Sequence, residues 1–214
     1  MRILITGANR GIGAAMDRAF RNEGHEVLGT ARNDPGFLPL DVTDLASQRD
    51  LARQLEGQAI DAVVCNAGVF LDKEEGLADG YPPEMWADSF AVNVTGVFLT
   101  VQSLLPNLQL SEAPKIAIIS SQMASHERAP GGSYIYRASK AAALNLGRNL
   151  AADLKGIGVA VGIYHPGWVQ TDMGGSTAEI TPVQAGEGLL ERIKALSVET
   201  TGCFETWDGR PHPY

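Results

Sequence analysis

Short apolar runs alternate with longer amphipathic stretches along almost the whole chain. A continuously apolar run predicts a strand buried on both faces, and helical spacing between such runs predicts the parallel connections of a βα repeat. The predicted strands are 3–6, 26–30, 59–65, 115–120, 159–164 and 203–206, and the predicted helices are 13–23, 44–55, 83–105, 133–154 and 182–195. This pattern predicts an α/β fold with a doubly wound parallel sheet.

The length and charge of the chain narrow the function classes. Its 214 residues suit a single domain over 1–214. The net charge of −8 argues against nucleic acid or an anionic membrane as the main partner. The cysteines Cys65 and Cys203 are far apart, and no group of His, Cys or acidic residues has metal spacing. An apolar first strand directly after Met1 and the lack of any apolar run near the roughly 18 residues of a membrane span favour a cytoplasmic protein.

A glycine-rich loop follows the first predicted strand and opens the first predicted helix. Glycine allows a tight turn and a close approach of the backbone to a ligand, and the free N–H groups of a helix N-terminus bind phosphate. The strand–turn–helix context is that of a dinucleotide fingerprint, although the spacing is G-x3-G-x-G. We therefore predict a single-domain Rossmann fold, with a plain glycine-rich turn as the alternative. The predicted binding residues are Gly7, Asn9, Arg10, Gly11, Ile12 and Gly13.

The residues after the second predicted strand bear on the choice between NADP and NAD. An acid there binds the 2′-hydroxyl of NAD, whereas an arginine suits the 2′-phosphate of NADP. The strand ends at Ala31 without an acid, and Arg32 follows, with Arg10 of the glycine loop as a second candidate for the same phosphate. Asp34 is the counter-argument, and both arginines have an ordinary solvated role as their alternative. We predict NADP as the cofactor, with NAD as the second choice.

Tyr136 and Lys140 lie four residues apart in a predicted helix, which places them on one face. A positive charge beside a phenol favours the phenolate, so we expect Tyr136 to be a general acid with a lowered pKa. The same spacing arises by chance on half-exposed helices. The pair alone is therefore weak evidence for catalysis, and the other motifs of the chain are needed to support it.

Seven segments, in their order and spacing, resemble the short-chain dehydrogenase/reductase family. They are Thr6–Gly13, Leu40-Asp41-Val42, Cys65-Asn66-Ala67-Gly68, Asn93-Val94-Thr95-Gly96, Ile119-Ser120-Ser121, Tyr136-x3-Lys140, and His165-Pro166-Gly167 with Thr171. The resemblance runs from Met1 to about Met173. Within the family, the chain is similar to the short C-factor and sniffer-like carbonyl reductases through residues 131–137, 168–175 and 202–209.

The resemblance implies hydride transfer between a nicotinamide and a carbonyl or alcohol carbon. Tyr136 would donate the proton in reduction and accept it in oxidation, and Lys140 would lower the pKa of Tyr136 and bind the nicotinamide ribose. Ser121 would hold the substrate oxygen, and Asn93 would position a water that connects Lys140 to solvent. Tyr136 and Lys140 thus belong to both the catalytic and the cofactor site.

The resemblance also implies the remaining cofactor contacts. Asp41 would accept from the adenine amino group, with Val42 beside it. The adenosine side would be lined by Asn66, Ala67 and Gly68, and the nicotinamide side by Pro166, Gly167, Val169 and Thr171.

The position of Ser121 departs from the family pattern. The family serine usually lies 13 residues before the tyrosine, whereas Ser121 lies 15 before Tyr136. We interpret this as a two-residue insertion in 122–132, because Ser121 directly follows an apolar strand. If Tyr134 were the catalytic tyrosine, the distance from Ser121 would be 13 residues as in the family. Lys140 would then lie six residues after the tyrosine and off its helix face. The other hydroxyl candidates are Ser120 and Ser125.

Three further properties are expected from the resemblance. The activity is expected on a small-molecule carbonyl or alcohol, and an NADP(H)-binding redox-sensing or signalling module with little turnover is the alternative. The short segment 174–181 favours an open substrate cleft. A homo-oligomer, dimer or tetramer, is expected through helices 83–105 and 133–154.

Overall fold

Seven parallel strands form one sheet in the computed structural model, which describes residues 1–214. The sheet order is β3-β2-β1-β4-β5-β6-β7. The strands are β1 (Arg2–Thr6), β2 (Glu26–Ala31), β3 (Leu38–Pro39), β4 (Ala62–Cys65), β5 (Lys115–Ile119), β6 (Ala160–His165) and β7 (Phe204–Thr206). The α-helices are α1 (Gly11–Asn22), α2 (Leu45–Gln54), α3 (Pro83–Phe90), α4 (Gly96–Leu108), α5 (Tyr134–Leu154) and α6 (Pro182–Ala195).

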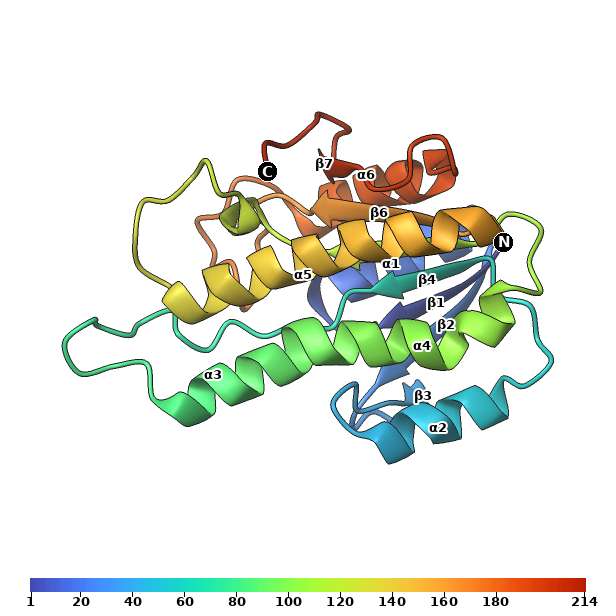
Figure 1. Ribbon diagram of the computed structural model, residues 1–214, viewed down its shortest axis with the longest axis horizontal. Coiled ribbons are helices and arrows are strands. Elements are labelled where there is room, and N and C mark those ends of the chain that lie inside the picture. The colour runs from blue at the N-terminus through green and yellow to red at the C-terminus, as the bar shows by residue number, and fades with distance from the viewer.

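Helices cover both faces of the sheet, with α4 and α5 in front of the strands and α1 and α6 behind them (Figure 1). Successive side chains of a strand point to opposite faces, so each strand feeds two cores. Ile3 and Ile5 of β1 pack with α1 and α6 in a 14-residue cluster, whereas Leu4 packs in a 23-residue cluster under α2, α4 and α5. The predicted single-domain Rossmann fold with a doubly wound sheet is confirmed.

The sheet reverses its winding direction between β1 and β4. From β1 the chain adds β2 and β3 on one side, and it then returns to add β4 on the other, with Ile5 opposite Val64. Ligands of such sheets bind at the carboxyl ends of the strands beside this switch point. The glycine loop after β1 and the segment after β4 therefore lie side by side at the expected binding edge.

Two elements differ from the prediction. β3 was not predicted, because two residues are too few to show a strand pattern; Leu38 pairs with Thr30 of β2. The predicted helix 83–105 is divided, since a π-helix at Ala91–Thr95 separates α3 from α4. A π-helix carries one extra residue per turn and often marks a functional position.

The helical run Pro83–Leu108 is the one segment long and apolar enough to cross a membrane by length and composition. Its mean hydropathy is 1.3 over its most apolar window. Its residues Val97, Val101, Leu104 and Leu108 belong to the larger core cluster. The apolar character of the run is therefore that of a helix packed on a sheet.

Candidate active site

The glycine loop takes backbone conformations that favour glycine. Gly7 and Gly11 have φ angles of +66° and +54°. A Cβ on Gly13 would lie 2.1 Å from the carbonyl oxygen of Gly7, so only glycine fits there. Arg10 is the N-cap residue of α1, and its side chain makes no hydrogen bond to the helix. The N–H groups of the first turn are therefore available to an anion. The loop has the form that a dinucleotide phosphate requires.

Residues after β4 brace this loop. Thr6 Oγ1 accepts from the backbone N–H groups of Asn66 and Ala67, both at 3.0 Å. The Asn66 amide donates to the carbonyl oxygens of Thr6 (2.9 Å) and Gly7 (3.1 Å). The Asn66 side chain thus holds the loop in shape. Gly68, in the same segment, lies next to Lys140, because a Cβ on Gly68 would lie 3.4 Å from Lys140 Nζ. The residues that brace the glycine loop therefore lie beside the Tyr136–Lys140 pair.

The expected adenosine end carries several exposed charges. Arg10 forms a 3.5 Å ion pair with Asp172, although its side chain is 72% exposed. Arg32 is exposed, and Asn9 donates to Asp34 at 3.4 Å, so Asp34 also lies beside the glycine loop. The two arginines and the counter-candidate Asp34 all stay predictions as contacts of the adenosine ribose.

Asp41 and Val42 come shortly after β3, at the same carboxyl edge of the sheet as the glycine loop. Burial raises the pKa of the Asp41 carboxyl, but two hydrogen bonds from Thr43 and the charge of Arg32 outweigh burial, so the net pKa is lowered. Val42 is buried against Gly96, where a Cβ would lie 2.9 Å from Val42 Cγ2. Asp41 is thus an ionised acceptor at neutral pH.

Tyr136 lies in the first turn of α5, and its side chain is only 8% exposed. Ser121, two residues beyond the end of β5, lies beside the phenol, where its hydroxyl favours the phenolate. The Phe70 ring stacks on it with centroids 4.2 Å apart. Burial raises the pKa of Tyr136 to about 12, against the lowering effect of the Ser121 hydrogen bond, and the charge of Asp72 adds to the rise. The expected lowered pKa is therefore wrong for this structure, because burial and the charge of Asp72 outweigh the Ser121 hydrogen bond.

Lys140 is buried one turn further along α5. Its Nζ donates to the Ile119 carbonyl at 3.0 Å and lies 5.7 Å from the centroid of the Tyr136 ring. Burial lowers the pKa of Lys140 to about 8, so the amine is mostly charged at pH 7. The structure thus brings Ser121, Tyr136 and Lys140 together.

Asn93 occupies the centre of the π-helix. Its Nδ2 donates to the Val69 carbonyl and to Ser139 Oγ, and its Oδ1 accepts from the Val69 N–H, all at 2.9 Å. Both amide hydrogens are therefore used inside the protein. The side chain fixes the segment that follows β4, and its role toward a water stays a prediction.

The alternative hydroxyls and tyrosine are used elsewhere. Ser120 donates to the Lys140 carbonyl at 3.1 Å, and Ser125 donates to the Tyr214 carbonyl at 3.2 Å. Tyr134 is 39% exposed and packs edge-on against Tyr81. Between Ser121 and α5 the chain forms a 3₁₀ turn at Gln122–Ala124 and a loop, and the insertion there stays an interpretation.

The segment after β6 closes the site near the glycine loop. Pro166 and Val169 are buried, and Gly167 has a φ of +90°. A Cβ on Gly11 would lie 3.5 Å from Thr171 Cγ2, so Thr171 faces the loop. The Thr171 hydroxyl donates to the Val169 carbonyl at 3.3 Å and accepts from the Gly174 N–H at 3.1 Å.

Sequence reasoning missed Asp72, which is 1% exposed and accepts from the backbone N–H groups of Ile135 and Tyr136. Its loop position, more than 60 residues before its partners, gave no local signal.

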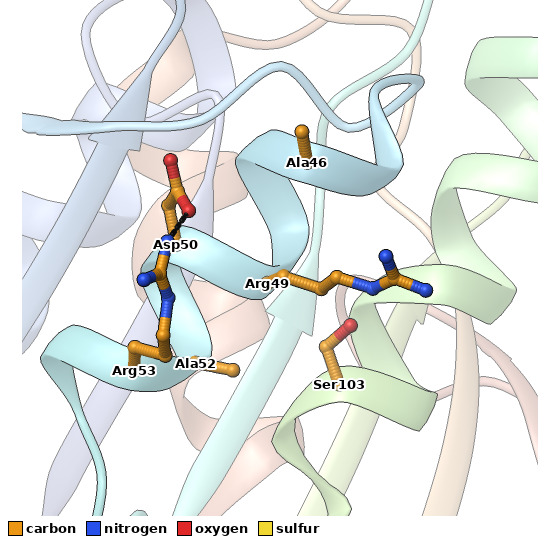
Figure 2. Close-up of a pocket in the computed structure, with 6 residues that line it drawn as sticks. All are labelled: Ala46, Arg49, Asp50, Ala52, Arg53 and Ser103. Carbon is orange, nitrogen blue, oxygen red and sulfur yellow. Dashed lines mark hydrogen bonds and ion pairs between the residues drawn. The ribbon is translucent and has the colours of Figure 1, made fainter.

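A surface hollow of about 580 Å³ lies elsewhere, between α2 and α4. Figure 2 shows Arg49 extending from α2 toward α4, and Arg53 paired with Asp50. The lining residues are Ala46, Arg49, Asp50, Ala52, Arg53 and Ser103, and none is a predicted site residue.

Fold and site together define a dinucleotide-binding protein with a serine–tyrosine–lysine group at the switch-point edge. A model of the short chain dehydrogenase family matches residues 1–181, and the chain belongs to this family of oxidoreductases. A 1-hydroxy-2-glutathionyl-2-methyl-3-butene dehydrogenase of Rhodococcus sp. (strain AD45) is 34% identical over 97% of this chain and 96% of its own length. The C-signal protein of Myxococcus xanthus is 33% identical over 72% of this chain and 93% of its own length.

Solved structures show the same likeness. The NADPH-bound carbonyl reductase from chicken fatty liver has a TM-score of 0.91 at 26% identity, covering 100% of this chain and 98% of its own. The carbonyl reductase Sniffer of D. melanogaster has a TM-score of 0.91 at 25% identity, covering 100% of this chain and 99% of its own. The resemblance to sniffer-like carbonyl reductases is confirmed.

Proposed function

We propose that the protein is an NADP-dependent carbonyl reductase that also oxidises the corresponding alcohol. The observation that carries the proposal is the meeting of Tyr136, Ser121 and Lys140 at the carboxyl edge of the sheet. The nicotinamide, when bound, supplies or accepts the hydride. The glycine loop, Asp41 and the segments after β4 and β6 are the residues that would hold the cofactor.

Tyr136 carries the proton side of the reaction. With a pKa of about 12, the phenol is protonated at neutral pH and is a proton donor to the carbonyl oxygen as negative charge develops there. Ser121 holds that oxygen through its hydroxyl. Lys140, mostly charged at pH 7 with a pKa of about 8, stabilises the phenolate that remains. Each reduction consumes one hydride and one proton, and alcohol oxidation returns both.

The NADP preference rests on Arg10 and Arg32. Both side chains are exposed and so accessible to a ligand, and a guanidinium fork matches a phosphate. Two solved relatives at 26% identity support the choice: the NADPH-bound chicken enzyme and a short-chain dehydrogenase/reductase from Burkholderia multivorans with bound NADP. Asp34, beside Asn9, is the group that favours NAD instead.

The substrate side is open. Residues 174–181 form a short connection before α6 with no helix of their own. Trp168 and Met173 beside it are 43% and 40% exposed. An uncovered cleft of this kind suits a range of small-molecule carbonyls or a bulky one. A crystal structure with substrate in which this connection folds into a helix over the nicotinamide would contradict the open cleft.

The protein is further proposed to be a cytoplasmic homo-oligomer. The half-exposed rings of Trp86 on α3 and Phe98 on α4 offer apolar area for a second copy. Sedimentation velocity tests this, and a monomer at micromolar concentration would overturn it.

The second candidate is an NADP(H)-binding redox-sensing or signalling module with little turnover. The likeness to the C-signal protein favours it. The intact Ser121, Tyr136 and Lys140 group argues against it, because binding alone needs no proton donor.

The deciding experiment combines nucleotide titration with turnover. Nicotinamide fluorescence is followed as the pure protein is titrated with NADPH and then with NADH. A panel of aldehydes, ketones and quinones is then assayed at saturating nucleotide. Tighter NADPH binding with turnover supports the reductase, binding without turnover on any panel member supports the sensing module, and no binding of either nucleotide overturns both.

A further inference from the structure

The first turn of α5 lacks a cap from its own sequence. The helix begins at Tyr134, and the N-cap residue Ser133 has a φ of +47° and makes no side-chain cap bond. An N-cap side chain normally accepts from the second or third N–H of the helix. Those two groups belong here to Ile135 and to Tyr136 itself, so the missing cap concerns the proposed proton donor.

Asp72 supplies this cap from a distant segment. Its Oδ2 accepts from the Ile135 N–H at 2.8 Å, and the Tyr136 N–H lies 3.2 and 3.3 Å from the two carboxylate oxygens. The side chain is 1% exposed. It is held in place by the helix it caps.

No cation neutralises this buried carboxylate. None of the ion pairs in the structure includes Asp72. A buried charge is costly unless hydrogen bonds and opposite charge compensate it. The compensation comes from the two N–H groups and from the positive end of the 21-residue helix α5. Helix and carboxylate therefore stabilise each other.

The same segment holds Tyr136 at a second point. Phe70 stacks on the Tyr136 ring at an interplanar angle of 19°. Val69, the residue before it, is tied on both its N–H and its carbonyl to Asn93. The segment Val69–Asp72 thus runs from the π-helix to the phenol and fixes both the ring and the backbone of Tyr136.

We propose that Asp72 is a positioning residue for Tyr136: it caps α5 from outside the helix and so sets the place of the phenol against Ser121. This inference rests on the proposed function for its catalytic consequence only. Displacement of a proton donor by about 1 Å is enough to cost up to about a hundredfold in rate.

The charge of Asp72 gives the role a second signature. The charged groups near the Tyr136 ring are Asp72 and, from α5, Lys140. Burial is the larger cause of the raised pKa of Tyr136, and the negative charge of Asp72 raises it further. Removing that charge lowers the pKa of Tyr136, so D72N makes the phenol a stronger proton donor and loses less rate than D72A.

The test compares Asp72→Ala, Asp72→Asn and the control Glu74→Gln, which removes a charge from an exposed position in the same loop. For D72A we expect at least a tenfold loss of kcat, NADPH affinity within twofold, and at least tenfold faster amide exchange in the first turn of α5. For D72N, which keeps an acceptor, we expect a smaller loss of kcat with NADPH affinity again within twofold. E74Q should match the parent in every measurement.

The amide exchange rate shows whether the first turn of α5 is capped, and the measurement needs no substrate. Unchanged exchange at residues 134–136 in D72A overturns the cap, and an unchanged kcat in both D72A and D72N overturns the positioning role. If D72A does not fold, D72N decides alone by the same criteria. Failure of the proposed function is a different result, because the parent protein then shows no turnover while the exchange difference persists.

Discussion

The Thr6 hydroxyl is, beside the Asn66 amide, one of the two side-chain groups that brace the glycine loop against the segment after β4. Its Oγ1 accepts from the N–H groups of Asn66 and Ala67 at 3.0 Å and donates to the Val64 carbonyl at 3.4 Å. The residue itself is 2% exposed. Thr6→Val keeps the shape of the side chain and removes all three hydrogen bonds.

The expected cost follows from the groups left unpaired. An unsatisfied buried N–H costs about 1–3 kcal/mol. Two are lost here, and because Asn66 and Ala67 are half-buried, water recovers part of the penalty. We expect Thr6→Val to lower the free energy of unfolding by about 2–4 kcal/mol, and the melting temperature by roughly 4–16 °C for a chain of this size.

The assay is urea denaturation followed by circular dichroism without nucleotide, with the m-value required to stay constant. Thr6→Ser keeps the hydroxyl and should lose only about 1 kcal/mol for the missing methyl. Thr177→Val, at an exposed threonine with no side-chain hydrogen bond, should stay within about 0.5 kcal/mol of the parent. A Thr6→Val protein as stable as Thr6→Ser would refute the reasoning.

Two further perturbations test other parts of the structure. In Gly13→Ala the new Cβ would lie 2.1 Å from the Gly7 carbonyl oxygen, so we expect a fluorescence titration to show NADPH affinity at least tenfold weaker, with Gly156→Ala, which meets no atom within 4 Å, unchanged. Burial, followed by the charge of His212, lowers the pKa of His165 from 6.5 to about 4. As the pH falls below 6.5, His165 takes up a proton in the unfolded chain but stays neutral in the folded protein. The free energy of unfolding is therefore lower by about 2–3 kcal/mol at pH 4.5 than above pH 6.5. Urea unfolding at pH 7.0 and 4.5 checks this, and the parent and His165→Asn losing equal stability over this range would contradict it.

Local sequence pattern was sufficient for every strand except β3, for the glycine loop and for the one-turn spacing of Tyr136 and Lys140, although the weight of that pair came from the other family segments. Each of these is encoded within a few adjacent residues, by continuous hydrophobicity, by glycines at a strand end, or by a one-turn helical spacing. Ser121 was predicted from the family resemblance, and its place after an apolar strand favoured it over Ser120 and Ser125 although its distance from Tyr136 departs from the family pattern.

What local pattern could not provide depends on contacts between distant segments. The cap on α5 joins Asp72 to Ile135, and nothing near either residue in the chain predicts the pair. The pKa of Tyr136 was predicted in the wrong direction because a spacing shows the nearby lysine but not the burial. A continuous helix was predicted where the structure has a π-helix around Asn93, because the hydropathy pattern does not distinguish the two.

The central claim is that the Tyr136 hydroxyl delivers the proton to a carbonyl oxygen. The most direct test is the rate of carbonyl reduction by Tyr136→Phe against the parent at saturating NADPH, with the nucleotide dissociation constant measured in parallel. The account predicts a loss of about 10²–10⁴ in kcat with NADPH affinity within twofold. A Tyr136→Phe protein that keeps kcat within threefold of the parent would contradict it.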